Sequence, residues 1–174
     1  RLGSNQRELR VVTTMGGNDR ALLKFKVPPA MENARSMSAS IDWSPDGEWI
    51  VFTESRHHPE YLSLSAFNVS TGQRVLITEP DAGGEDYAPA FSPDGRNIAF
   101  TRSDGILKGS IHVVQFMPDS PQSAALVRLP DATPWNSDPE WSVDGSELVF
   151  SSGRWPRTGL WHMPADGSAD PQPL

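Results

Sequence analysis

The chain has 174 residues, no cysteine, 16 prolines, 14 glycines and 37% hydrophobic residues, a composition typical of a globular domain that excludes a disulfide-stapled scaffold. A formal net charge of -7, with acids and bases interleaved, argues against nucleic acid as a direct partner. All apolar runs are far shorter than the roughly 20 residues that cross a bilayer, so we expect no membrane insertion in this segment.

Two β-rich runs with a turn between them open the chain. Residues 9–14 and 21–27 are rich in residues that favour strands, and the Met-Gly-Gly-Asn-Asp at residues 15–19 is typical of a turn. We expect residues 1–37 to hold the two outer strands of a preceding four-stranded unit and a connecting loop.

A segment that occurs three times follows. The copies at residues 40–56, 88–104 and 138–154 align position by position, and each contains an Asp-Gly pair. The aspartates of these pairs are separated by 48 and 50 residues. Such a period lies within the range expected for the blades of a propeller.

Each copy predicts a β-hairpin. The first strand ends in an aromatic residue, the turn reads Ser-Pro-Asp-Gly or, in the third copy, Ser-Val-Asp-Gly, and a β-rich second strand follows. Because the Asp-Gly pairs repeat in every copy, we interpret them as structural turns and not as catalytic groups. The predicted turn residues are Asp46, Gly47, Asp94, Gly95, Asp144 and Gly145, and the aromatic residues Trp43, Phe91 and Trp141 are expected to pack between neighbouring units.

Two further strands complete each unit. They are expected at residues 61–69 and 73–78, at 110–116 and 124–129, and at 159–163 with a short segment ending at Leu174. We therefore predict an all-β chain, a β-propeller fragment of about three and a half four-stranded antiparallel blades. The predicted blades span residues 38–87, 88–137 and, nearly complete, 138–174, with further blades expected from the same chain or from associated copies.

The repeated pattern Ser-Pro-Asp-Gly-x-x-Ile-x-Phe-Thr resembles the WD-repeat-like propeller repeat of the TolB family over residues 38–174, and the third copy departs from it with Val143 in place of proline. A similar repeat occurs in the propellers of prolyl-oligopeptidase and dipeptidyl-peptidase-type serine peptidases, in tricorn-like proteases and in bacterial winged-helix regulators. The resemblance implies the fold directly and leaves several functions open.

A search for catalytic and metal-binding motifs finds no Gly-x-Ser-x-Gly, His-Glu-x-x-His or phosphate-binding loop, so we expect no catalysis and no cofactor in this segment. Two clusters could hold a metal ion: residues 56–60, which read Arg-His-His-Pro-Glu, and the acidic residues of 79–86. We interpret both as solvated loops and predict no metal site. Adjacent histidines in a hydrophilic loop are usually solvated, and the spacing of the acidic cluster matches no calcium motif.

Loop residues that do not repeat are the better candidates for binding. In a propeller, the loops that enter the first strand and leave the second gather on one face, where partners dock. Trp135 and the Trp155 region, with its neighbouring arginines, have the composition of an interface hot spot, although these tryptophans could equally cover the end of a blade. The predicted partner-binding residues are Arg56, His57, His58, Tyr87, Arg102, Asp104, Trp135, Arg154, Trp155 and Arg157.

Three functions remain open at this point. The first is a non-catalytic TolB-like module of a larger bacterial protein that binds a protein or peptide partner, or senses a ligand, on the channel face. The second is the substrate-gating propeller of a prolyl-oligopeptidase or dipeptidyl-peptidase-type serine peptidase, whose catalytic residues lie elsewhere. The third is a small-molecule or sugar-binding enzyme that uses the channel. It would require several non-repeating His, Asp or Glu side chains at the channel mouth, for which His57, His58 and Asp104 are the candidates. The resemblance to TolB implies a periplasmic or otherwise extracytoplasmic location, with a cytoplasmic location as the alternative.

Overall fold

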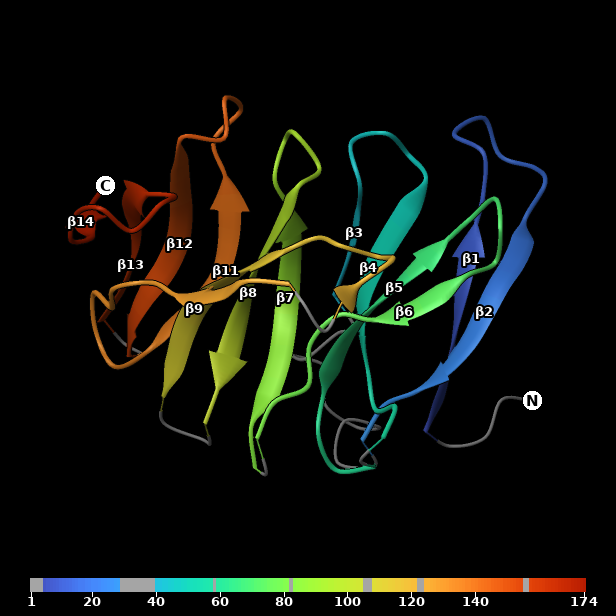
Figure 1. The fold of residues 1–174 in the computed structure, drawn as a ribbon, viewed down its shortest axis with the longest axis horizontal. Helices are drawn as coiled ribbons and strands as arrows, with labels where there is room; N and C mark the ends of the chain where they lie inside the picture. The colour runs from blue at the N-terminus through green and yellow to red at the C-terminus, as the bar shows by residue number, and fades with distance from the viewer. Residues whose placement is uncertain are drawn as a thin grey trace.

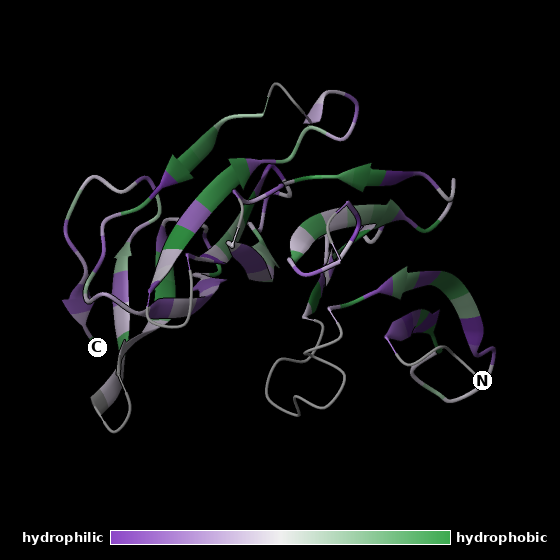
Figure 2. Cartoon of the chain, turned by 90° about the horizontal axis from the view of Figure 1, so that it is seen from below, coloured by the Kyte–Doolittle hydropathy of each residue, from purple (hydrophilic) through white to green (hydrophobic). Residues whose placement is uncertain are grey.

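The computed structural model describes residues 5–28, 40–57, 59–81, 83–104, 108–121, 124–154 and 157–174, and these residues form an all-β fold of four antiparallel sheets (Figure 1). The prediction of a β-propeller fragment with three and a half blades is confirmed. Figure 2 shows the sheets following one another around an arc. No helix in the described part of the chain is long and apolar enough to span a bilayer.

The half blade comes first and has two strands, β1 (Gln6–Val11) and β2 (Arg20–Lys26). Three four-stranded sheets follow, each a simple meander in chain order. Blade 1 contains β3 (Ile41–Trp43), β4 (Trp49–Glu54), β5 (Ser63–Asn68) and β6 (Arg74–Leu76). Blade 2 contains β7 (Glu85–Phe91), β8 (Asn97–Ser103), β9 (Gly109–Gln115) and β10 (Leu126–Arg128). Blade 3 contains β11 (Asn136–Trp141), β12 (Glu147–Arg154), β13 (Arg157–Pro164) and β14 (Gln172–Pro173).

The Asp-Gly turns join the first two strands of each blade with the same geometry. Gly95 has a φ of 70°, in the left-handed region that a glycine adopts without strain. Asp94 accepts hydrogen bonds from the hydroxyl of Ser92 at 2.6 Å and from the backbone N–H of Arg96 at 3.0 Å. These bonds hold the pKa of the Asp94 carboxyl below its usual range. In the third copy the same bonds form around Asp144, with its pKa lowered to about 2 by the Ser146 and Ser142 donors.

The core consists of three clusters, one at each joint between neighbouring sheets. Every blade inserts a fully buried phenylalanine from its second strand toward the sheet before it: Phe52, Phe100 and Phe150. Phe100, for example, packs among Val51 and Leu64 of blade 1. Because the pattern recurs at each joint, burial of these side chains stabilises the stacking of one blade on the next.

A leucine or isoleucine on the third strand faces the sheet that follows. Leu64 in blade 1 and Ile111 in blade 2 occupy equivalent register positions and are 0% and 1% exposed. Their equivalent in blade 3 is Leu160, which is 59% exposed, and its backbone partner Leu174 is 72% exposed. Blade 3 therefore presents to solvent the same apolar face that blades 1 and 2 bury.

The aromatic residues that end the first strands differ in their packing. Phe91 is buried, with its ring 5.1 Å from that of Phe116, and the Trp141 indole N–H donates to the Ala90 carbonyl in the preceding blade at 3.0 Å. The prediction of packing between blades was wrong for Trp43, which is 42% exposed. The reason is that the described half blade has only outer strands, so no inner strand lies beside Trp43.

Candidate functional site

The two ends of the sheets differ in character. The Asp-Gly turns form one end, along the upper edge of Figure 1, and the segments that leave the second strands form the other. We call this second end the loop face, and define it as the described residues within 55–62, 77–84, 103–108, 129–135 and 154–157. The second and third strands meet there, as the pairing of Glu54 with Ser63 and of Ser103 with Gly109 shows.

The structure places most predicted partner-binding residues at or near the loop face. Arg56 and His57 follow β4 and are exposed, and Asp104 follows β8 and is exposed. Trp135, which is partly buried, directly precedes β11. His58 and Trp155 lie outside the described residues, as do the side chains of Arg154 and Arg157, whose backbones pair with each other at the end of β12 and the start of β13.

The two clusters that the sequence offered as metal sites meet in space. The Nδ1 atom of His57 lies 2.9 Å from the Oε1 atom of Glu79, which brings the loop after β4 against the loop after β6. Both side chains are about half exposed. Within the part of the chain that the structure describes, no three His, Cys, Asp or Glu side chains come together in a way that could hold a metal ion.

Arg102 is engaged inside its own blade. Its Nε and Nη2 atoms donate to the two carboxylate oxygens of Asp86 at 2.7 and 2.8 Å, and its guanidinium lies over the ring of Phe100. Asp86 is completely buried. The hydrogen bonds to Asp86 raise the pKa of Arg102. This predicted partner-binding residue is therefore a structural cation that compensates a buried carboxylate.

Tyr87 lies in β7, close to acidic side chains of two blades. Burial, followed by the negative charges of Asp138 and Glu85, raises the pKa of the Tyr87 phenol to about 12. Burial also raises the pKa of Glu85. The phenol is therefore a neutral group at physiological pH and acts as a hydrogen-bonding or packing surface.

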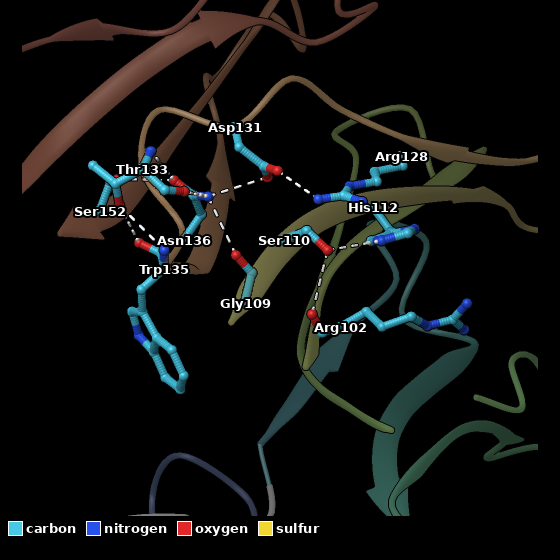
Figure 3. A network of polar contacts seen from close by, with 10 residues as sticks. All are labelled: Arg102, Gly109, Ser110, His112, Arg128, Asp131, Thr133, Trp135, Asn136 and Ser152. Carbon is cyan, nitrogen blue, oxygen red and sulfur yellow. Dashed lines mark hydrogen bonds and ion pairs between the residues drawn. The ribbon is translucent and has the colours of Figure 1, made fainter. Parts of the chain in front are cut away.

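A polar network joins blades 2 and 3 next to Trp135 (Figure 3). The buried Asn136 amide donates to the carbonyls of Thr133 at 2.7 Å and Gly109 at 3.2 Å, and its oxygen accepts from the Ser152 hydroxyl at 2.8 Å. The Thr133 hydroxyl donates to the Trp135 carbonyl at 3.0 Å. The network fixes the backbone that carries Trp135, so the indole is presented from a rigid segment.

A second buried group extends this network in blade 2. His112 packs on Phe100, and its Nε2 atom lies 3.0 Å from the Ser110 hydroxyl, while no hydrogen-bond partner lies near its Nδ1 atom in the described part of the chain (Figure 3). Burial and the charges of Arg102 and Arg128 lower the pKa of His112 to about 4.

The antiparallel sheets follow one another around an arc, and each four-stranded sheet has the same Asp-Gly turn between its first two strands. This arrangement defines the chain as part of a β-propeller. The sequence matches the model of the TolB beta propeller domain over residues 7–172, and the chain belongs to this family.

Similar proteins include enzymes as well as TolB. The chain is 25% identical to dipeptidyl-peptidase 5 of Aspergillus fumigatus over 153 residues, which is 78% of this chain and 21% of that protein. Among solved structures, TolB from Acinetobacter baumannii has a TM-score of 0.67 at 20% identity, covering 92% of this chain and 35% of TolB. A puromycin-hydrolyzing peptidase of Mycobacterium tuberculosis has a TM-score of 0.68 at 16% identity, covering 91% of this chain and 26% of the peptidase.

The chain thus spans about a fifth of the dipeptidyl-peptidase and about a third of TolB. At these identities the structural likeness shows the fold alone. A shared propeller is compatible with binding and with gating, so function depends on the residues of the loop face.

Proposed function

We propose that this chain is a non-catalytic segment of a bacterial propeller that binds a protein or peptide through its loop face. The observation that carries the proposal is the contrast between the two ends of the sheets. The same Asp-Gly turn closes every blade at one end, whereas the loop face presents different side chains from each blade, among them Arg56, Asp104 and Trp135. Variable loops on a repeated scaffold are where propellers place their binding residues.

Two of the ionisable side chains near the loop face already form ion pairs within the chain, which supports a binding role over a catalytic one. His57 is paired with Glu79 and Arg102 with Asp86, so these side chains already have partners inside the chain. Trp135 instead combines a partly exposed ring with a fixed backbone, which is the usual arrangement of an interface anchor. We extend the proposed contact surface to His58, Arg154, Trp155 and Arg157 from their positions in the sequence.

A photo-crosslinking residue placed at Asp104 or Trp135 tests this function in cells of the source organism. We expect discrete protein adducts from both positions that disappear when excess unmodified chain is present. Val143, which is 97% exposed at the opposite end of blade 3, is the matched control and should give none. Adducts from Val143 alone, or no saturable adducts from the loop face, would contradict the proposal.

The second candidate is a gating propeller of a serine peptidase, and the similarity to dipeptidyl-peptidase 5 over most of this chain favours it. The full reading frame separates the two candidates. A Gly-x-Ser-x-Gly segment downstream, together with cleavage of short but not long peptides, would establish gating. A TolB-like protein without such a segment would keep the binding role.

We place the protein in the periplasm or another extracytoplasmic compartment, on the basis of its membership of the TolB propeller family. The cytoplasm is the alternative that accompanies the peptidase candidate. Fractionation of cells with an antibody against the chain distinguishes the two compartments.

A further inference from the structure

A pocket of about 290 Å³ lies where the half blade meets blade 1, next to the loop face. One wall is the end of β2 with Phe25, and the other is the end of β4 with Ser55. The backbone N–H of Ser55 donates to the Lys26 carbonyl at 2.7 Å, and the rings of Phe25 and Phe52 lie 5.0 Å apart. The two walls are therefore joined directly, and the pocket is formed before any ligand enters.

The charges around this pocket oppose those of the chain as a whole. The net charge of the chain is -7, yet the pocket is lined by four cationic residues and a single carboxylate, that of Glu54. Within the described residues, no acidic side chain pairs with Lys24, Lys26 or Arg56. The pocket thus concentrates positive charge that its surroundings do not neutralise, and it attracts anions.

Arg74 is the most firmly held of the four cations. Its Nε atom donates to Glu54 Oε1 at 3.1 Å and its Nη2 atom donates to Glu54 Oε2. Glu54 is buried, and the guanidinium also lies over the ring of Phe52, with Cζ 5.8 Å from the ring centre. These contacts fix the plane of the guanidinium group.

One edge of the Arg74 guanidinium remains unused. A guanidinium carries five N–H donors, and the bonds to Glu54 use one on Nε and one on Nη2. No acceptor within the described residues is bonded to Nη1. The edge formed by Nη1 and Nη2 has the spacing that matches two oxygens of a phosphate or carboxylate group.

We propose that this pocket binds a small oxyanion of the phosphate or carboxylate class, with the free edge of Arg74 as the fixed donor pair. Lys24, Lys26 and Arg56 are exposed and supply additional positive charge at the pocket rim. Arg is suited to the first role because its donors are planar and rigid, and Lys to the second because its ammonium group is mobile. Binding weakens as sodium chloride is added, since salt screens the exposed charges.

Calorimetric titration of the full chain with inorganic phosphate, and in parallel with succinate, tests the proposal and distinguishes the two classes of anion. Arg74→Lys keeps a cation beside Glu54 but removes the two-donor edge, and we expect at least about tenfold weaker binding. Lys26→Gln should weaken binding severalfold. Arg128→Gln is the matched control, because Arg128 is an exposed arginine in blade 2 outside this pocket, and it should leave the affinity unchanged.

Equal affinity of the unaltered chain, Arg74→Lys and Lys26→Gln would overturn the proposal, as would the absence of binding by either anion. Lys26 is exposed, so the Lys26→Gln result stands even if Arg74→Lys proves unstable in a melting experiment. Arg56 belongs both to this pocket and to the proposed partner-binding loop face, whereas Arg74 and Lys26 belong to the pocket alone. If these variants lose anion binding while crosslinking from Asp104 is unchanged, the anion pocket and the partner-binding surface are separate sites.

Discussion

Asp42 in blade 1 accepts a hydrogen bond from the backbone N–H of Phe91 in blade 2, with 2.7 Å between Oδ2 and N. Its other carboxylate oxygen accepts from the N–H of Trp43 at 2.8 Å, which fixes the side chain. Close by, the Ser40 hydroxyl accepts from the N–H of Ala88 at 2.8 Å. The inner strands of the two blades are thus joined by bonds from side chain to backbone, in addition to the apolar packing farther out.

Replacement of Asp42 with alanine should lower the free energy of unfolding by about 1 to 3 kcal/mol, because the Phe91 N–H loses a charged acceptor. Asp42→Asn retains a carbonyl acceptor and should cost less than Asp42→Ala. Urea denaturation of the three proteins measures the difference. Identical stabilities would mean that this bond contributes nothing to the joint between the blades.

Removal of Asp86 alone should be strongly destabilising. Asp86→Ala leaves the partly buried Arg102 cation without its partner, and we expect a loss of about 3 to 5 kcal/mol. The double variant Asp86→Leu with Arg102→Met should recover most of that loss, since no buried charge remains. Denaturation midpoints check this, and a double variant no more stable than Asp86→Ala would contradict it.

His112 makes the stability depend on pH. Its pKa is about 4 in the folded chain and about 6.5 when unfolded, so between these values the unfolded state binds more protons. The stability from the neutral imidazole is complete above pH about 6.5 and is lost progressively as the pH falls to about 4. The loss should reach about 3 kcal/mol, since a tenfold change in a protonation equilibrium corresponds to about 1.4 kcal/mol.

The control for His112 is the exposed His57. His112→Gln should flatten the decline in unfolding free energy between pH 7 and 4, whereas His57→Gln should leave it nearly intact. Urea denaturation at several pH values, with all three proteins, provides the comparison. A decline of the same depth in His112→Gln would assign the effect to other groups.

The sequence predicted the fold well because each local signal agreed with the repeat. The strands expected at residues 61–69 and 21–27 are observed as Ser63–Asn68 and Arg20–Lys26. Turn chemistry at Asp94 and Gly95 and β-rich runs such as that ending at Phe100 specify strands over short distances. Both signals are local, so they can be recognised without knowing which distant residues come into contact in the fold.

The site was less predictable, because its contacts join distant segments. Arg102 and Asp86 both belong to the predicted loop region, but only the pairing of β7 with β8 brings them together in the interior. Glu54 and Arg74 are separated by 20 residues and meet across blade 1. Side chains alternate between the two faces of a sheet, so a shift of one residue along a strand moves a side chain to the opposite face. Composition alone therefore does not distinguish an arginine that pairs inside the fold from one that binds a partner.

The apolar face of blade 3 yields a fourth prediction. Leu64→Lys places a charge in a fully buried position between blades and should unfold the chain or cost several kcal/mol. Leu160→Lys changes the equivalent position in blade 3, which is exposed, and should be nearly neutral. Circular dichroism melting of both variants is the measurement. Equal damage from both would show that the Leu160 face is covered in solution.

Leu64, Ile111 and Leu160 occupy equivalent register positions on the third strands of blades 1, 2 and 3, so the blades are repeats of one structural unit. Blades 1 and 2 each accept the phenylalanine of the following blade through one face and insert their own through the other, so the described joints are built from similar sets of side chains. A unit of about fifty residues could then be inserted or removed at a joint without redesigning its neighbours.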